Sequence, residues 1–221
     1  MIGGIDEAGR GPVLGPLVVC GVAIDDPGRL SAIGVRDSKL LSPDRRRALD
    51  RAIRTMPGVR IAMASLSAEE LEQRMARSTL NLVEADTFAD VARRLGVDGL
   101  QHLVVDAADV DAERFGDHIR ARLPGVRVLS QHKADTNHAV VGAASILAKV
   151  ARDEAVAQLG RILERKVGVA LGSGYPGDEQ TQRFLEAWWR MHKSWPEGIR
   201  SHWKTARLVA APKAVQLDAY L

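Results

Sequence analysis

Two acidic residues at the end of the first apolar segment restrict what this chain can fold into. Asp6 and Glu7 follow a short run with strand character, and Gly9-Arg10-Gly11 comes directly after them. A second, mostly apolar strand pattern covers residues 16–24, so the glycine-containing turn predicts an antiparallel hairpin. Carboxylates at the end of a buried strand are costly unless a cation meets them, and hard oxygen ligands suit a divalent metal. The opening of the chain therefore predicts a metal site beside a turn that lets a ligand approach the backbone closely.

Composition narrows the class of protein. The 221 residues fit one domain with a small C-terminal appendage, and a net charge of +3 permits nucleic acid as a partner without requiring it. The single cysteine, Cys20, lies in an apolar run, which excludes a disulfide framework and indicates a core residue in a reducing compartment. No apolar run is long enough for a membrane span, and the N-terminus lacks the pattern of a signal peptide. We therefore expect a cytoplasmic protein.

Hydrophobic periodicity and capping signals predict a mixed α/β arrangement in which helices cover the faces of a sheet. The expected strands cover residues 1–8, 16–24, 60–66, 100–107 and 126–129. The expected helices cover residues 44–56, a segment beginning at 67, and residues 79–95, 139–163 and 181–192. Residues 206–221 are the candidate tail, because Pro212 interrupts them.

Two further acids lie where α/β proteins place functional side chains. Asp106 ends the strand expected at 100–107, and Asp135 precedes the long helix. Together with Asp6 and Glu7 they could converge on one cleft, where divalent ions would neutralise them and activate water. An acid at a strand end is, however, more often a cap or turn former, and adjacent residues on a strand point to opposite faces. The spacing alone leaves both interpretations open.

Several motifs in one order resemble the ribonuclease HII family, in its archaeal-type branch. The resemblance covers nearly the whole chain, and although one motif alone would be weak, chance agreement of all of them is remote. The motifs are residues 4–12 (GIDEAGRGP), 37–39 (DSK), 105–108 (VDAA), 132–135 (HKAD), 143–150 (AASILAKV), 172–176 (GSGYP) and 200–205 (RSHWKT).

The resemblance implies an RNase H-like α/β fold, with a central mixed sheet, flanking helices and a helical C-terminal extension, in a catalytic domain spanning residues 1–205. It implies a monomeric, metal-dependent endoribonuclease that cleaves RNA in RNA–DNA hybrids. It also implies incision on the 5′ side of single ribonucleotides in duplex DNA, leaving 5′-phosphate and 3′-hydroxyl ends. The implied catalytic set, which would bind Mg²⁺ or Mn²⁺, is Asp6, Glu7, Asp106 and Asp135.

Substrate contacts follow from the same motifs, each with a structural alternative. Gly9-Arg10-Gly11 can offer backbone groups to the ribose 2′-hydroxyl, which distinguishes RNA from DNA, or can be a plain hairpin turn. Lys39 and Lys149 would lie near phosphates, although Lys149 could instead pair with Asp153 on the same helix. Tyr175 resembles the family's tyrosine that stacks near the junction between ribonucleotide and deoxyribonucleotide, or it is a packing residue.

The last residues suggest a partner. Leu217, Tyr220 and Leu221 have the spacing of apolar anchors on one helical turn, and they resemble the sliding-clamp-binding peptide of replication proteins. Ala214 departs from that pattern, which usually has glutamine there. An amphipathic turn packed on the protein's own core is an equal alternative.

Two other function classes would use similar residues. A junction resolvase of similar fold would cleave without regard to ribose, and a hybrid-binding module would bind without metal-dependent cleavage.

Overall fold

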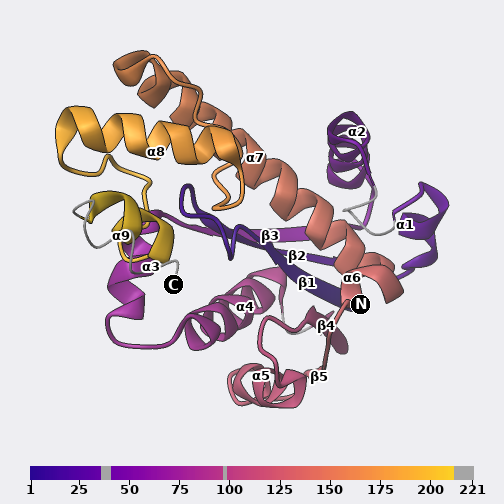
Figure 1. Ribbon diagram of the computed structural model, residues 1–221. Coiled ribbons are helices and arrows are strands. Elements are labelled where there is room, and N and C mark those ends of the chain that lie inside the picture. The colour runs from indigo at the N-terminus through magenta and orange to yellow at the C-terminus, as the bar shows by residue number, and fades with distance from the viewer. Residues whose placement is uncertain (36–40, 97–98, 212–221) are drawn as a thin grey trace. The chain divides into compact units, whose positions relative to one another are not determined.

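The computed structural model describes residues 1–35, 41–96 and 99–211. Within these residues, one mixed sheet has the strand order β3-β2-β1-β4-β5 (Figure 1). β1 pairs antiparallel with β2 and parallel with β4, and β4 pairs parallel with β5, so the predicted antiparallel pairing of the first two strands is confirmed. The strands are β1 (Ile2–Ala8), β2 (Leu17–Ile24), β3 (Arg60–Leu66), β4 (His102–Asp106) and β5 (Arg127–Gln131).

Helices make up most of the remaining regular structure. Among the described residues, no helix is both long enough and apolar enough to cross a bilayer. The helices are α1 (Gly28–Ala32), α2 (Pro43–Arg54), α3 (Ala68–Met75), α4 (Leu80–Gly96), α5 (Ala112–Arg120), α6 (Ala134–Asn137), α7 (Ala139–Val167), α8 (Glu179–His192) and α9 (Lys204–Ala210).

The chain forms two compact units. The first comprises Met1–Ala8, Val18–Ser65 and Arg74–Ala151, and it contains nearly all of the sheet. The second comprises Gly9–Leu17, Leu66–Gln73 and the chain from Arg152 onward. The four acids of the predicted catalytic set belong to the first unit, whereas the Gly9-Arg10-Gly11 turn belongs to the second.

Two apolar layers hold the first unit together, one on each face of the sheet (Figure 1). On one face α4 and α5 pack against the strands, with the Phe88 and Phe115 rings edge to face at 5.3 Å between centroids. On the other face the first part of α7 and the α2 side chains Leu49 and Ile53 cover the strands. Cys20 is fully buried in this second layer, and burial raises the pKa of its thiol, so the predicted core role is supported.

The second unit has an apolar core of its own. Phe184 and Trp188 of α8 pack there with Val156 of α7 and with Val13 and Leu14 from the segment after β1. Backbone hydrogen bonds fix that segment, because the Val13 N–H donates to Gly174 O at 2.9 Å. The connection between β1 and β2 is therefore an integral part of this unit and not a short hairpin turn.

Most predicted elements are present, and the differences lie at ends and in short helices. The α7 helix runs one turn beyond the predicted end at 163, and it stops where Gly168 takes a φ of +70°. Helix α5 was not predicted, although Asp111 caps it by accepting from the Arg114 N–H. Its buried apolar side chains, Phe115 and Ile119, lie four residues apart on one face of the helix. Helix α9 crosses the predicted boundary at residue 206, and the division into residues 1–205 and 206–221 stays a prediction.

Candidate metal centre

Neighbouring strands carry two of the predicted acids at the same edge of the sheet. The parallel register of β1 and β4 places Ile5 opposite Val105, so the next residue on each strand is an aspartate. Asp106 is also the last residue of β4. Asp135 lies in the short helix α6, which begins three residues after the end of β5, the strand next to β4. Asp106 ends β4, Asp6 lies two residues before the end of β1, and Asp135 follows β5, so the three acids meet toward the carboxyl ends of these parallel strands.

These three aspartates form one tight cluster. A carboxylate oxygen from each of Asp6, Asp106 and Asp135 lies within 4.8 Å of the others. Asp6 is 4% exposed and Asp135 is 2% exposed. Buried carboxylates at such distances repel one another unless a cation or protons neutralise them. The donor set consists only of hard oxygens, which fits a divalent ion such as Mg²⁺ or Mn²⁺.

Hydrogen bonds orient the cluster. Oδ1 of Asp6 accepts from the Glu7 N–H at 2.7 Å, and Oδ1 of Asp106 accepts from the Ala134 N–H at 3.0 Å. The side chain of Ser145, on α7, also hydrogen-bonds to Asp6. Ser145 belongs to a motif that the sequence analysis quoted without giving this residue a role. Its hydroxyl supports Asp6 from the helix that covers this face of the sheet.

The raised pKa of Asp6 indicates that the ionised carboxylate cluster is unfavourable without a bound cation. Burial raises the pKa of Asp6 well above its usual value, and the charges of Glu7 and Asp106 raise it further. The hydrogen bonds from Ser145 and from the Glu7 N–H lower it and only partly offset these effects. A bound divalent cation would favour the ionised carboxylate instead.

Glu7 lies outside the three-carboxylate cluster. β1 stays extended through Ala8, so Asp6 and Glu7 project to opposite faces of the sheet. Ile5, which shares a face with Glu7, packs in the apolar layer of α4 and α5. The Glu7 charge nevertheless reaches Asp6, since it raises the pKa of that residue. The structure therefore brings together three of the four predicted acids and leaves Glu7 beside them.

A glycine on β1 allows α7 to approach the site. A Cβ built on Gly4 would lie 2.4 Å from the carbonyl carbon of Val140 and from the nitrogen of Val141. Gly4 is on the same face as Asp6, two residues earlier. The absence of a side chain at Gly4 thus lets the α7 backbone lie directly on the strand, one turn before Ser145.

In the second unit, the Gly9-Arg10-Gly11 turn is fixed from within. Gly9 has a φ of +93°, and a Cβ there would lie 2.3 Å from Pro16 O, so Gly9 is required by the backbone. Gly11 differs, because a Cβ there would meet no atom within 4 Å. The Arg200 guanidinium donates to the carbonyls of Gly9, Arg10 and Gly15 at 2.5, 2.9 and 3.0 Å.

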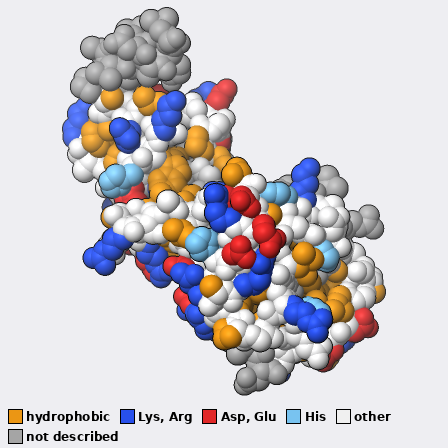
Figure 2. Space-filling view, turned by 90° about the horizontal axis from the view of Figure 1, so that it is seen from below, with side chains coloured by type: hydrophobic (Ala, Val, Ile, Leu, Met, Phe, Trp, Pro, Cys, Tyr) orange, Lys and Arg blue, Asp and Glu red, His pale blue; other side chains and the backbone are white. Residues whose placement is uncertain are grey.

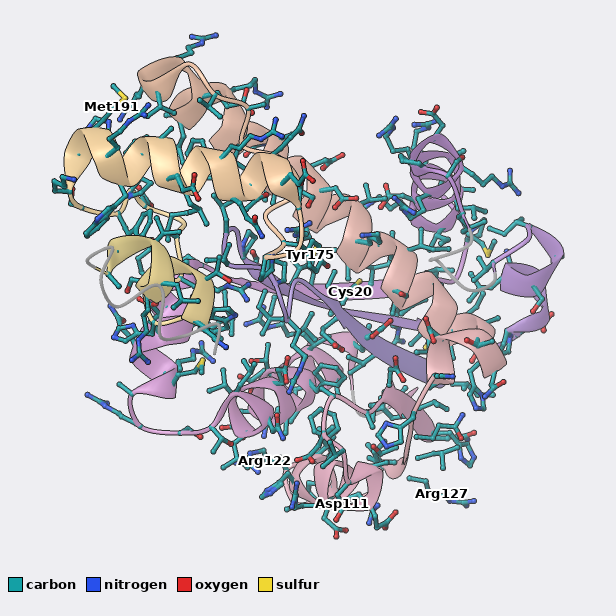
Figure 3. All side chains as sticks on the ribbon, viewed as in Figure 1. Cys20, Asp111, Arg122, Arg127, Tyr175 and Met191 are labelled. Carbon is teal, nitrogen blue, oxygen red and sulfur yellow. The ribbon has the colours of Figure 1, made fainter. Side chains whose placement is uncertain are left out.

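A second arginine supports the turn that carries Tyr175. Arg152 Nη2 donates to Ser173 O at 2.6 Å, and its guanidinium lies 4.9 Å from the centroid of the Tyr175 ring. Tyr175 is 39% exposed, in the segment that precedes α8 (Figure 3). A Cβ on Gly174 would lie 2.8 Å from Leu14 O, so this glycine is needed for packing. Tyr175 is thus partly packed and partly open to solvent.

The other predicted contacts are less defined. Lys149 lies on α7 and is partly exposed. Lys39 and the tail residues Leu217, Tyr220 and Leu221 lie outside the described residues. The sequence indicates no role for Arg152, and it marks Arg200 only as the first residue of the 200–205 motif. Their burial could not be read from the sequence.

The distribution of surface charge does not identify a binding face. Lys and Arg side chains lie interspersed with Asp and Glu on the face seen in Figure 2. This mixture agrees with the small net charge of +3. The carboxylate cluster in the first unit and the two turns in the second unit are the candidate functional features, each within its own unit.

Comparisons with known proteins agree with this geometry. The model of the family described as Ribonuclease HII matches residues 3–206. Ribonuclease HII of Thermococcus sibiricus is 41% identical over 211 residues, which cover 94% of this chain and 90% of that protein. Ribonuclease HII of Archaeoglobus fulgidus, solved in complex with PCNA, superposes with a TM-score of 0.85 at 38% identity, covering 96% of this chain and 98% of that one. Ribonuclease H2 of Pyrococcus horikoshii gives a TM-score of 0.82 at 36% identity, covering 95% and 96%.

The mixed sheet with its flanking helices is an RNase H-like fold, as the sequence predicted. A buried aspartate cluster that could hold a divalent metal lies at the edge of the sheet. The chain belongs to the ribonuclease HII family, and the named relatives are archaeal. It is accordingly a hydrolase of the ribonuclease H class, and family membership supports activity on RNA–DNA hybrids.

Proposed function

We propose that this enzyme cleaves RNA in RNA–DNA hybrids and incises duplex DNA on the 5′ side of single ribonucleotides, leaving 5′-phosphate and 3′-hydroxyl ends. The observation that carries the proposal is the cluster of Asp6, Asp106 and Asp135, whose carboxylate oxygens lie within 4.8 Å of one another. Such a cluster suits hydrolysis of a phosphodiester, whose own negative charge must be neutralised near the acids.

The acids have separate roles in this proposal. Asp6, Asp106 and Asp135 would hold Mg²⁺ or Mn²⁺, and Glu7 would complete the set from the neighbouring position. When bound, the metal would supply Lewis-acid chemistry at the phosphate and a water of lowered pKa. Ser145 and the Ala134 N–H hold Asp6 and Asp106 in place. Lys39 and Lys149 would contact phosphates.

Recognition of ribose is assigned to the Gly9-Arg10-Gly11 turn, which follows Glu7 within two residues of chain. The 2′-hydroxyl both donates and accepts hydrogen bonds, so backbone groups can distinguish it from deoxyribose. Because the 2′-hydroxyl is held and is not the nucleophile, the products would keep a 3′-hydroxyl on one side and a 5′-phosphate on the other.

Replacing Gly11 by Ala tests this assignment without disturbing the fold. A Cβ at Gly11 meets nothing within 4 Å and its φ is not positive, so the melting temperature should stay at the wild-type value. A methyl group facing the substrate should lower kcat/KM on ribonucleotide-containing duplexes by about 10- to 100-fold. Gly99→Ala is the matched control. The atom nearest to the added Cβ would belong to the flexible Arg60 side chain, at 3.4 Å, and Gly99 precedes β4, whereas Asp106 ends that strand. Unchanged turnover by Gly11→Ala would leave the turn with a backbone role only.

Tyr175 is assigned to stacking at the junction of ribonucleotide and deoxyribonucleotide. Its partial exposure supports this assignment, and the Arg152 contact on the ring supports the packing alternative. Tyr175→Ala should weaken cleavage at single ribonucleotides by about 5- to 150-fold, since a stacked base contributes about 1–3 kcal/mol, and should affect continuous hybrids less. Tyr175→Phe keeps the ring and should behave like wild type. An equal loss on both substrates would identify Tyr175 as a packing residue.

A sliding clamp is the proposed protein partner. Support comes from the apolar spacing of Leu217, Tyr220 and Leu221 and from the similar Archaeoglobus fulgidus protein, which was solved with PCNA. Deleting residues 217–221 should abolish binding to the clamp from the same source while the melting temperature and hybrid cleavage remain unchanged. A large fall in melting temperature would instead favour a tail packed on the protein's own core.

One assay separates the proposed activity from its rivals. A DNA duplex with one ribonucleotide is incubated with protein and Mg²⁺ or Mn²⁺, beside an all-DNA duplex of the same sequence. We expect one incision 5′ to the ribonucleotide, with a 3′ end that a polymerase extends and a 5′ end that a ligase joins. Equal cleavage of the all-DNA duplex would favour a junction-resolving nuclease, and binding without products would favour a hybrid-binding module.

A further inference from the structure

The most unusual charged group in the second unit is Arg200. It is 0% exposed and is among the largest fully buried side chains. Its hydrogen bonds go to three backbone carbonyls, and among the described residues no carboxylate forms an ion pair with it. A buried cation without a carboxylate partner is expensive, because its hydration is lost and no opposite charge replaces it.

The electrostatics of Arg200 confirm that cost. Burial, followed by the nearby charge of Arg152, lowers the pKa of Arg200 to about 10. Glu72 and Tyr175 act in the opposite direction and offset these effects only in part. The Trp203 ring lies 5.0 Å from the guanidinium carbon, which gives partial compensation through a cation–π contact. An apolar residue here would avoid burying the charge but would leave three carbonyls without a donor, so the purpose of the guanidinium lies in those carbonyls.

The three acceptors suggest that purpose. Two of them are consecutive carbonyls of the Gly-Arg-Gly turn, those of Gly9 and Arg10. In a trans peptide the carbonyl and the following N–H point in opposite directions. With both carbonyls directed at Arg200, the N–H groups of Arg10 and Gly11 must point away from the buried guanidinium. The planar fork of arginine suits this task, because it can donate to several carbonyls at once in a fixed geometry.

We propose that Arg200 is a positioning residue for ribose recognition: it holds the Gly9 and Arg10 carbonyls inward so that the Arg10 and Gly11 N–H groups face the 2′-hydroxyl. The inference rests on the proposed role of the turn. It also refines that role, since two of the turn's three carbonyls are committed to Arg200. The donors are then backbone N–H groups whose direction is set by Arg200.

Arg200→Lys is the variant of choice for the test. Lysine keeps the charge and length but presents its donors from one nitrogen, which cannot match three separated carbonyls. Arg200→Met removes the donors altogether. The matched control is Trp188→Phe on α8, which removes the part-buried hydrogen bond from the indole N–H to Ser194 O and leaves both turns unchanged. The melting temperature of each variant is measured first, so that binding can be compared at a temperature at which all of them are folded.

The readout is discrimination for ribose. Dissociation constants are measured, with Ca²⁺ in place of Mg²⁺ to limit cleavage, for a duplex with one ribonucleotide and for the all-DNA duplex. The preference is the ratio of the dissociation constant for the all-DNA duplex to that for the ribonucleotide-containing duplex. We expect Arg200→Lys to lower this ratio about tenfold and Arg200→Met to lower it at least as much. Affinity for all-DNA duplex should change less than twofold, and the Mn²⁺-induced shift in melting temperature should persist. Trp188→Phe should keep the full preference.

The outcomes are distinguishable. A wild-type protein without any ribose preference would overturn the proposed function itself. A wild-type preference that survives intact in folded Arg200→Lys and Arg200→Met would overturn only the role of Arg200. Should neither variant fold, hydrogen exchange on the wild type tests the same geometry. The Arg10 and Gly11 amides should become protected by the ribonucleotide-containing duplex and not by all-DNA duplex, and equal protection would overturn the inference.

Discussion

Replacing Asp106 by Asn is expected to reduce cleavage of RNA–DNA hybrids by at least about a thousandfold, equivalent to roughly 4 kcal/mol of activation free energy. The substitution removes one of the three negative charges that would hold the metal. It keeps the side-chain oxygen that accepts from the Ala134 N–H, so the local backbone should not move. The protein should remain folded and still bind hybrid, because removing a charge beside Asp6 relieves repulsion in the metal-free cluster.

The effect on metal binding gives an independent check. Mn²⁺ should stabilise the folded wild type and so raise its melting temperature. At a Mn²⁺ concentration 100 times the dissociation constant, the gain in free energy of unfolding is about 2.7 kcal/mol. Asp106→Asn should lose most of this shift. Asp90→Asn is the matched control, since Asp90 is an exposed acid paired with Arg93 on α4, and both its activity and its Mn²⁺ response should be unchanged. Turnover by Asp106→Asn at the wild-type rate in ordinary Mg²⁺ would remove Asp106 from the metal site.

Gly4→Ala is expected to have the largest effect on stability. The added methyl would overlap backbone atoms of Val140 and Val141 at 2.4 Å, and backbone cannot turn away as a flexible side chain can. Separating α7 from β1 should cost about 3 kcal/mol or more, which lowers the melting temperature by roughly 6–12 °C for a chain of this size. Activity should fall as well, because the same helix carries the Ser145 hydroxyl that supports Asp6.

Gly11→Ala and Gly99→Ala are the controls for this effect, since neither added Cβ approaches backbone. Both should melt within about 1 °C of the wild type. A Gly4→Ala protein that also melts at the wild-type temperature would contradict the close packing of α7 on β1.

The sheet could be predicted because its strands are apolar and end at polar turns. Residues 17–24 are buried along their entire length, and Asp106 marks the end of the fourth strand, whereas the first strand continues two residues beyond Asp6. The register that makes Asp6 and Asp106 neighbours could only be inferred from the general rule for parallel strands. Short helices such as α6 lack enough residues for a periodic signal, and the left-handed Lys133 before it is not encoded by a glycine.

The candidate site was predicted in part, and the limits have physical causes. Asp6 and Asp106 are neighbours because the register of β1 and β4 pairs the residues before them, and Asp135 joins them from α6, which begins three residues after β5 ends. Glu7 does not join the cluster because β1 continues as a strand beyond it, and strand alternation then separates neighbours. Arg152 and Arg200 could not be recognised as buried, since arginine is usually exposed and nothing local in the sequence shows that carbonyls surround it.

The most direct test of the central claim is the metal dependence of cleavage by the wild-type protein. An RNA–DNA hybrid and a DNA duplex of the same sequence are incubated with metal-free protein in a chelator, and Mg²⁺ or Mn²⁺ is then added in steps. The account predicts no products in the chelator, cleavage of the RNA strand that rises and saturates with added metal, and an intact DNA duplex throughout. RNA cleavage at an undiminished rate in the chelator, or equal cleavage of the DNA duplex, would contradict it.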